Sequence, residues 1–339
     1  MLLSVIVSVY NEEQGLKQFY ETTSRILHEI CERETWQHGV CSKYDESGAA
    51  FSSADCKKNS ASLSYELLFV NDGSSDKSGE ILAALRKQDP EHVGVVTFSR
   101  NFGHEAAMTA GLDYASGDYL VFMDADLQHP PQCIAQILDA FGGGADIVTM
   151  VRTKNETAGL VKNITSDAFY RVVNRLSSMH LEPGASDFFA IDRRVADVLR
   201  HNFREKVRFL RGYVQNIGFN KVQLSYEAAP RVAGQSHYSL KKLWRFSVDT
   251  IICFSNLPLK LGIYAGLFSA LCGVLLILYT LLTRQGAPSG YATIVVVLCF
   301  MFAVLFALLG IIGEYIAIIF NELKDRPIYI VEDLEQTKK

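Results

Sequence analysis

Two long uncharged stretches near the C-terminus constrain the fold of this 339-residue chain more than any other feature. They run from Leu261 to Thr283 and from Gly286 to Gly313. A helix of about 20 apolar residues crosses a bilayer, so either stretch is long enough to span one. Two core helices of a soluble protein are the alternative, but such helices are usually shorter. We therefore predict a pair of transmembrane helices over residues 261–320, followed by a tail over 321–339.

Basic residues around these stretches predict how they are oriented. Arg284 is the one charged residue between the two stretches. The outer flanks carry Arg231, Lys241, Lys242, Arg245, Lys260, Lys324 and Arg326. Because Lys and Arg are enriched on cytoplasmic flanks, we expect a multi-pass protein of the plasma (inner) membrane with both termini in the cytosol. Seven cysteines without a CxxC pair fit that reducing compartment.

Residues 1–230 alternate apolar runs with amphipathic stretches, and this alternation predicts an α/β domain. The expected strands are Leu3–Val9, Tyr65–Val70, Val93–Phe98, Tyr119–Met123 and Asp146–Met150. The expected helices are Glu12–Ile30, Lys77–Gln88, His104–Ala115 and Pro131–Phe141. Strands that alternate with helices form a mostly parallel sheet with helices on both faces. Ligands of such sheets bind at the carboxyl ends of the strands.

Two segments interrupt this pattern. Residues 31–64 are rich in Ser, Ala, Lys and Asp with little periodicity, which predicts a surface insertion. Residues 238–254 have an apolar face and a basic face at helical spacing. Such a helix, within a juxtamembrane segment 231–260, is typical of the membrane surface. Packing on the sheet is the alternative for the same helix.

Composition and missing motifs exclude several function classes. The net charge of −4 shows no basic excess, so we expect no nucleic-acid partner. The chain has neither a GxGxxG nor a Walker A sequence, which argues against dinucleotide cofactors and P-loop chemistry. The functional residues must therefore be sought in other motifs.

The strongest candidate site is the sequence Met123-Asp-Ala-Asp-Leu-Gln128, directly after an expected strand. In an extended segment Asp124, Asp126 and Gln128 point the same way. Carboxylate and amide oxygens are ligands that suit Mg²⁺ or Mn²⁺ bridging phosphates. A solvated turn is the alternative, but the strand before and the helix after favour a cation site.

Two further polar motifs follow expected strands. Asp72 lies in Phe69-Val-Asn-Asp-Gly-Ser-Ser-Asp76, where it can accept hydrogen bonds from a base or ribose while its neighbours cap the next helix. Tyr10, Asn11 and Glu12 follow the first strand. Three polar sites at three strand ends predict a single nucleotide among them.

These motifs, together with SRNFGHEAAMTAGLDYASGD and MDADLQHPP, resemble the polyprenyl-phosphate glycosyltransferases of glycosyltransferase family 2. This group includes bactoprenol glucosyltransferases and dolichyl-phosphate mannose synthases. The resemblance covers residues 2–30 and 65–260, and two C-terminal spans match the bactoprenol branch. It implies a Rossmann-like GT-A fold, a nucleotide-sugar donor, a divalent metal and a lipid-phosphate acceptor.

The resemblance also implies roles for particular residues. Those expected at the nucleotide are Tyr10, Asn11, Glu12, Asp72 and Asp124. Those expected at the metal, Mg²⁺ or Mn²⁺, are Asp124, Asp126 and Gln128. Those expected at the acceptor phosphate are Arg152, Lys162, Arg231, Ser236, Tyr238 and Lys241. Those expected to be catalytic are Asp126, Asp187 and Arg152.

The chain departs from the family pattern at two places. His129 stands where an Asp often follows DLQ, and we expect little effect because the metal ligands precede it. Asp187-Phe188 is followed by Phe189 instead of the Arg or Lys that the family often has, so the chain keeps the carboxylate and lacks the basic side chain at this position. Arg208 and Arg211 lie in a family motif, with structural ion pairing as the alternative.

The expected reaction is inverting transfer of one hexose from a nucleotide sugar, with UDP-glucose favoured, to a polyprenyl phosphate, with undecaprenyl phosphate favoured. The lipid bilayer is an expected partner, and self-association through the transmembrane helices is expected. A processive polysaccharide synthase and a non-catalytic nucleotide-binding membrane scaffold are the alternatives. A transporter is disfavoured because the stretches carry no interior charge apart from Glu314 at the end of the second.

Overall fold

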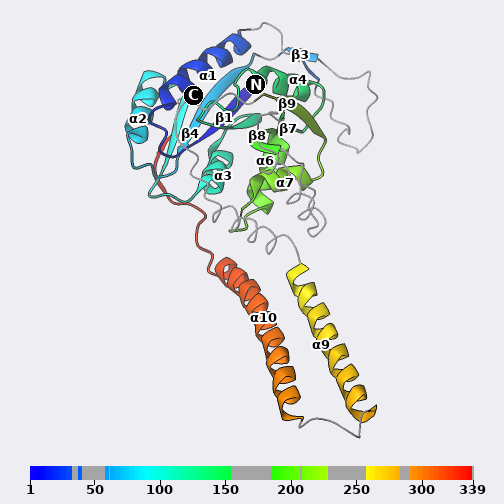
Figure 1. Cartoon of the computed structure of the whole chain (residues 1–339). Coiled ribbons are helices and arrows are strands. Elements are labelled where there is room, and N and C mark those ends of the chain that lie inside the picture. Colours follow the sequence, from blue (N-terminus) through cyan, green and yellow to red (C-terminus); the bar gives the residue numbers. More distant parts are fainter. Residues whose placement is uncertain are drawn as a thin grey trace. The chain divides into compact units, whose positions relative to one another are not determined.

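The protein divides into two compact units in this computed structural model (Figure 1). The larger comprises Met1–Tyr170, His180–His237 and Pro327–Lys339, and the smaller comprises Arg171–Met179 and Tyr238–Arg326. The structure describes residues 1–32, 37–39, 58–60, 62–153, 185–206, 208–227, 257–282 and 290–337.

The larger unit is built on a mixed sheet whose order, over the described residues, is β10-β5-β4-β1-β6-β8-β7-β9. The strands are β1 (Leu2–Val9), β4 (Ser64–Asn71), β5 (Val93–Phe98), β6 (Tyr119–Asp124), β7 (Ile147–Arg152), β8 (Ala185–Asp192), β9 (Lys221–Tyr226) and β10 (Val331–Glu335). β1, β4, β5 and β6 run parallel, as predicted. β8 is antiparallel to β6 and β7, and β10 is antiparallel to β5. The sheet is therefore mixed, but six of its eight described strands run in one direction, in agreement with the predicted mostly parallel sheet.

Helices between the strands cover the sheet, which confirms the predicted α/β class. They are α1 (Leu16–Cys31), α2 (Ser78–Gln88), α3 (His104–Tyr114), α4 (Cys133–Gly142), α6 (Arg193–Asn202) and α7 (Leu210–Asn216). The central strand β1 is buried along nearly its whole length. A strand covered on both faces reads as a continuous apolar run, which is why the sequence LLSVIVSV predicts it well.

Helix α3 packs unusually close to β1. A Cβ added at Gly111 would lie 2.1 Å from the Cγ2 atom of Ile6, so any larger residue would push the helix away from the sheet. The close packing fixes the start of α3, at His104, beside the carboxyl end of β1. Gly111 therefore contributes to the position of the candidate site.

The predicted insertion 31–64 contains two short described strands. β2 (Gln37–Gly39) and β3 (Lys58–Ser60) pair antiparallel with each other, separately from the main sheet. Residues 33–36, 40–57 and 61 lie outside the described residues.

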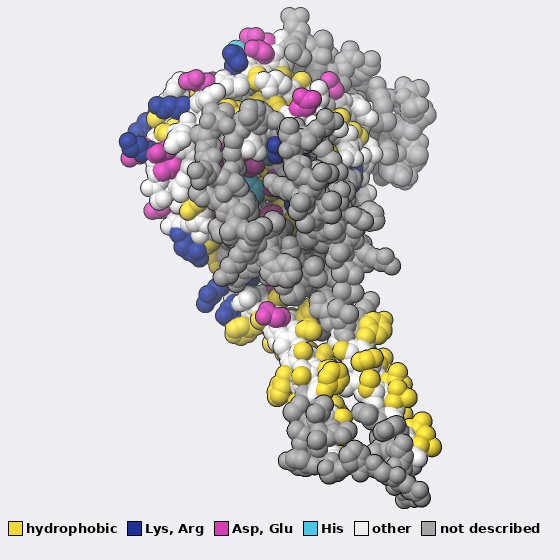
Figure 2. All heavy atoms as spheres, viewed as in Figure 1, with side chains coloured by type: hydrophobic (Ala, Val, Ile, Leu, Met, Phe, Trp, Pro, Cys, Tyr) yellow, Lys and Arg dark blue, Asp and Glu magenta, His cyan; other side chains and the backbone are white. Residues whose placement is uncertain are grey.

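The smaller unit contains two long helices, α9 (Leu257–Leu282) and α10 (Tyr291–Leu323), which lie side by side (Figure 1). Gly262 lets them approach, because a Cβ there would lie 2.4 Å from the Cδ2 atom of Leu308. Figure 2 shows hydrophobic side chains gathered over both helices. Among the described residues, one helical segment is long and apolar enough to cross a membrane, Phe300–Leu323, with a mean hydropathy of 2.4. The predicted amphipathic helix 238–254 lies outside the described residues.

Candidate active site

The predicted polar motifs meet at the carboxyl edge of the sheet. β1 lies between β4 and β6, with Val9 opposite Asn71 and Ser8 opposite Asp124. The segments that follow these three strands therefore start next to one another. The structure thus brings together the motifs at Tyr10–Glu12, Asp72 and Asp124–Gln128.

The loop after β1 is tied to the loop after β4 by hydrogen bonds. Asn11 has a left-handed backbone (φ 56°), and its side-chain carbonyl accepts the N–H of Ser75 at 2.9 Å. The N–H of Glu12 donates to the Ser78 hydroxyl at 2.9 Å. Asn11 therefore holds the loops together, while the adjacent Tyr10 side chain is 49% exposed. An exposed aromatic ring beside two strand ends is well placed to stack on a base.

Asp72 is buried and binds the loop that follows β5. Its Oδ1 atom accepts the N–H of Phe102 at 2.6 Å, and Oδ2 accepts the N–H of Gly103 at 2.9 Å and the side-chain amide of Asn101 at 2.9 Å. Burial raises the pKa of the Asp72 carboxyl, and the hydrogen bonds from Phe102 and Gly103 oppose that shift. The next residue, Gly73, has a φ of 60°, and a Cβ there would lie 2.3 Å from the Arg100 carbonyl carbon. Asp72 thus organises residues 100–103.

The DxD turn after β6 has a constrained backbone. Asp124 is 35% exposed at its side chain, whereas Asp126 is 8% exposed and its Oδ1 atom accepts the N–H of Gln128 at 3.0 Å. Leu127, between Asp126 and Gln128, has a φ of 58°, a region that non-glycine residues rarely adopt. Strained backbone of this kind is concentrated at functional sites.

The side chain of His129 forms a hydrogen bond with the backbone of the same turn. Its Nδ1 atom accepts the backbone N–H of Asp124 at 3.1 Å. The ring stacks on Phe188, with centroids 5.0 Å apart, and meets Tyr226 edge-on at 5.9 Å. Where the family often has an aspartate, this chain therefore has a different acceptor that supports the backbone of the first DxD carboxylate.

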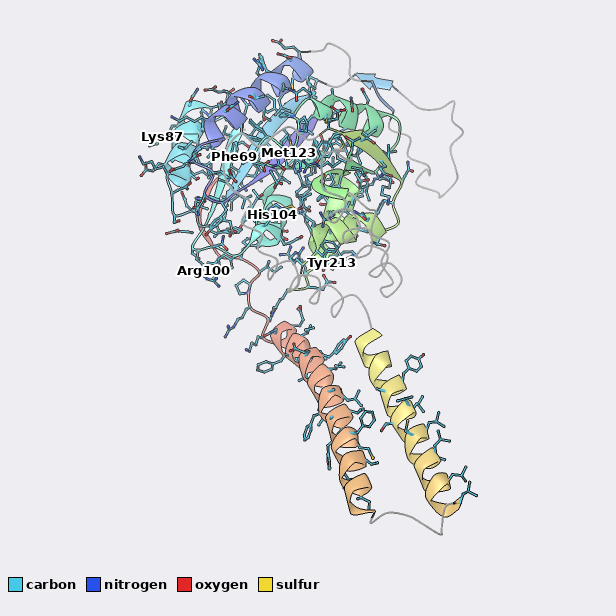
Figure 3. The ribbon with its side chains drawn as sticks, viewed as in Figure 1. Phe69, Lys87, Arg100, His104, Met123 and Tyr213 are labelled. Atoms are coloured by element: carbon cyan, nitrogen blue, oxygen red, sulfur yellow. The ribbon has the colours of Figure 1, made fainter. Side chains whose placement is uncertain are left out.

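A second charged cluster adjoins the turn, centred on His104 at the start of α3 (Figure 3). Its Nδ1 atom is 3.0 Å from the hydroxyl of Ser8, and its Nε2 atom lies 3.7 Å from Asp187 Oδ2 and 4.0 Å from Asp124 Oδ1. On the other side, the Nη1 atom of Arg211 is 3.4 Å from Asp187 Oδ1. Asp187 is thus placed between two basic side chains, His104 and Arg211, next to the DxD turn.

The charges of this cluster stabilise one another. Burial alone would raise the pKa of Asp187, but Arg211 and His104 outweigh it and hold that pKa well below its usual range. Burial likewise disfavours a charged His104, yet Asp187 and Asp124 raise its pKa to about 10. At neutral pH the cluster therefore holds an imidazolium at His104 beside the ionised carboxylate of Asp187. Burial and the charge of Asp187 raise the pKa of Glu105 to about 7.

The donor set suits a hard divalent cation whose remaining ligands come from elsewhere. Over the described ranges, no group of three or more His, Cys, Asp or Glu side chains forms a metal centre of its own. Mg²⁺ is commonly bound by one or two carboxylates together with substrate phosphates and water. Asp124 and Asp126, with the Gln128 amide, fit that mode of binding.

Some of the remaining predicted residues lie within the described part of the chain, and the others lie outside it. Arg152 is exposed at the end of β7, opposite Tyr226 of β9. The acceptor candidates outside the described residues are Lys162, Arg231, Ser236, Tyr238 and Lys241. Arg208 is buried and donates to the Phe203 carbonyl at 2.9 Å, which is a structural contact. His104 lies in the motif SRNFGHEAAM, but no role for it was predicted from the sequence, and a family role and structural ion pairing were both open for Arg211.

The fold and this strand-end acidic site define a glycosyltransferase of the GT-A type. The family model for glycosyl transferase family 2 matches residues 54–199, and that for the GtrB C-terminal hairpin matches residues 257–319. The chain belongs to glycosyltransferase family 2 and is a glycosyltransferase.

Relatives from several bacteria and phages match nearly the whole chain. An uncharacterized glycosyltransferase of Bacillus subtilis, YkcC, is 36% identical over 97% of this chain and 93% of its own length. The SfII prophage-derived bactoprenol glucosyl transferase of Shigella flexneri is 33% identical over 98% of both chains. Among solved structures, the glucosyl-3-phosphoglycerate synthase of Mycobacterium tuberculosis superposes weakly, with a TM-score of 0.43 and 18% identity over 74% of this chain and 77% of that one.

Proposed function

We propose that this protein transfers one hexose from a nucleotide sugar to a polyprenyl phosphate. The observation that carries the proposal is the full-length match to proteins named bactoprenol glucosyl transferase, which includes the C-terminal hairpin. UDP-glucose is the proposed donor and undecaprenyl phosphate the proposed acceptor. Self-association through the hairpin remains a prediction.

The donor is proposed to bind across the ends of β4, β1 and β6. Tyr10 would stack on the base, while Asn11, Glu12 and Asp72 shape the surrounding loops through the hydrogen bonds described above. Asp124, Asp126 and Gln128 would hold Mg²⁺ or Mn²⁺ with the diphosphate. When bound, the cation offsets the charge that develops on the departing nucleoside diphosphate.

Asp187 is proposed to position the acceptor instead of removing a proton. A phosphate monoester is largely ionised at neutral pH because its second pKa is about 6. A carboxyl whose pKa is depressed by Arg211 and His104 is a poor base, but it fixes both cations near the reacting groups. Direct attack of the phosphate oxygen on the anomeric carbon then inverts its configuration, and the main requirement is alignment of the two substrates.

Arg152 is predicted to bind the acceptor phosphate. Replacing it with alanine should raise the KM for the lipid phosphate by about tenfold, the expected loss of one charge-assisted contact, and leave the donor KM unchanged. Lys87→Ala, at an exposed position on α2 (Figure 3), is the matched control and should change neither constant. Equal increases in both KM values for Arg152→Ala would remove its acceptor role.

The two-span topology is also a proposal, with the connection between α9 and α10 outside the cytosol. Gly290→Cys should react with a membrane-impermeant maleimide in intact cells, because Gly290 is exposed just before α10. Lys87→Cys should react only after the cells are opened. Labelling is measured against the unmodified chain, and the reverse pattern would refute this orientation.

The proposed function is tested by a membrane-fraction assay with a panel of labelled nucleotide sugars. Label should enter the organic phase only when undecaprenyl phosphate is present, and most from UDP-glucose. A processive synthase would instead leave label in a polymer, and a scaffold would leave the donor intact.

A further inference from the structure

A strand from the end of the chain closes the sheet edge beside the loop that follows β5. β10 pairs antiparallel with β5, with Val331 opposite Phe98. One step further, the N–H of Ser99 donates to the carbonyl of Ile330 at 3.1 Å. The C-terminal segment therefore contacts the first residue of the loop 99–103.

Tyr329, just before β10, joins the end of β5 to the end of α3. Its ring stacks on Phe98, with centroids 5.0 Å apart and planes at 11°. Its hydroxyl donates to Asp113 Oδ2 at 2.7 Å, and Asp113 also accepts from Arg204 Nη1 at 2.8 and 3.0 Å. Burial, reinforced by Asp113, raises the pKa of Tyr329 well above its usual range, so the phenol remains a donor. The Tyr329 side chain thus links the end of β5 to the last turn of α3.

The same contacts continue into the candidate donor site. Phe98 packs edge-on against Phe102, with centroids 5.7 Å apart and planes at 89°. Phe102 and Gly103 donate their N–H groups to Asp72 at 2.6 and 2.9 Å. The following residue is His104, which begins α3. Tyr329 is therefore two ring contacts away from a residue bound to the Asp72 carboxylate.

We propose that Tyr329 is a positioning residue for the donor site. By holding Phe98 and the last turn of α3, it fixes the loop 99–103 and the orientation of α3, at whose start His104 lies. The proposal rests on the proposed function only in taking a nucleotide sugar as the ligand of this site. The alternative is that β10 merely covers an exposed sheet edge, as protective edge strands do.

The two possibilities predict different behaviour of the loop. An edge cover affects overall stability, whereas a positioning residue also controls local opening of the loop 99–103. Hydrogen exchange measures local opening directly. The full-length protein is therefore compared with Tyr329→Ala in detergent, without nucleotide.

We expect amides of the loop 99–103 to exchange at least about fivefold faster in Tyr329→Ala, while amides of β1 are unchanged. Tyr329→Phe keeps the ring contact and should restore the loop to within about twofold of the wild-type rate. Glu332→Ala, at an exposed position in β10, is the control and should change nothing. Loop exchange that stays at the wild-type rate, or rises only together with β1, would overturn the proposal.

Kinetics provide the second readout. Tyr329→Ala should raise the donor KM by roughly three- to tenfold and leave the acceptor KM unchanged, in line with the size of coupling through packed networks. Tyr329→Phe should recover most of that loss. Equal increases for donor and acceptor would contradict a donor-site role. If the wild-type protein transfers no sugar from any donor, the proposed function fails, while hydrogen exchange still decides the role of Tyr329.

Discussion

Replacing Asp126 with alanine is expected to lower sugar transfer by roughly a thousandfold or more, because a metal-assisted step loses several kcal/mol of charge stabilisation. Asp124→Ala should have a similar effect. Asp126 is buried in a turn that its own side chain closes, and Asp124 lies at the end of a central strand. Transfer is measured in membrane fractions with saturating Mg²⁺ or Mn²⁺.

The matched control for these variants is Asp139→Ala, at an exposed acidic position on α4. It should keep wild-type activity, and all three variants should reach the membrane in normal amounts. Turnover near the wild-type level in Asp124→Ala or Asp126→Ala would refute the cation site.

Replacing Asp187 with asparagine is expected to lower kcat by about a hundredfold while the protein still binds nucleotide. The change keeps the shape of the side chain but removes the charge between His104 and Arg211. Donor binding is measured by titration with UDP and Mg²⁺. A kcat within threefold of wild type would exclude Asp187 from the reaction.

The pair His104–Asp187 also predicts how stability depends on pH when divalent cations are absent. The pKa of His104 is raised to about 10, so its contribution is complete below its unfolded value of about 6.5 and is lost as pH rises toward 10. The pKa of Asp187 is depressed, so its contribution is complete above about 4 and is lost at lower pH. His104→Gln should therefore lower Tm more at pH 6 than at pH 9. An equal loss at both values would contradict the ionised pair.

Sequence pattern predicted the elements of the first part of the sheet. Val93–Phe98 is a strand over the predicted range, and β1 differs by one residue, because strands buried on both faces read as short apolar runs with clear ends. The position of the acidic motif was also predicted, since a pair of acids directly after such a run is a local feature. Its conformation was not, because the segment forms a turn after Asp124 instead of continuing as the extended chain expected from the sequence.

Other features depend on contacts that no local pattern contains. β10 has the sequence VEDLE, which reads as an exposed polar tail, and it becomes a strand only because β5 offers an unpaired edge. The contact between His104 and Asp187 likewise requires β8 to pair antiparallel with β6. Asp187 was predicted from its motif, but its two basic partners follow from the three-dimensional fold.

The central claim is that a single sugar moves from a nucleotide to a lipid phosphate at the DxD site. The most direct test is to incubate the purified protein with UDP-glucose and undecaprenyl phosphate and to measure the mass of the lipid product by mass spectrometry. We predict a product heavier by one hexose, formed in equal amount with UDP and absent with Asp126→Ala. A polymer, a lipid carrying several sugars, or the same product from Asp126→Ala would contradict the account.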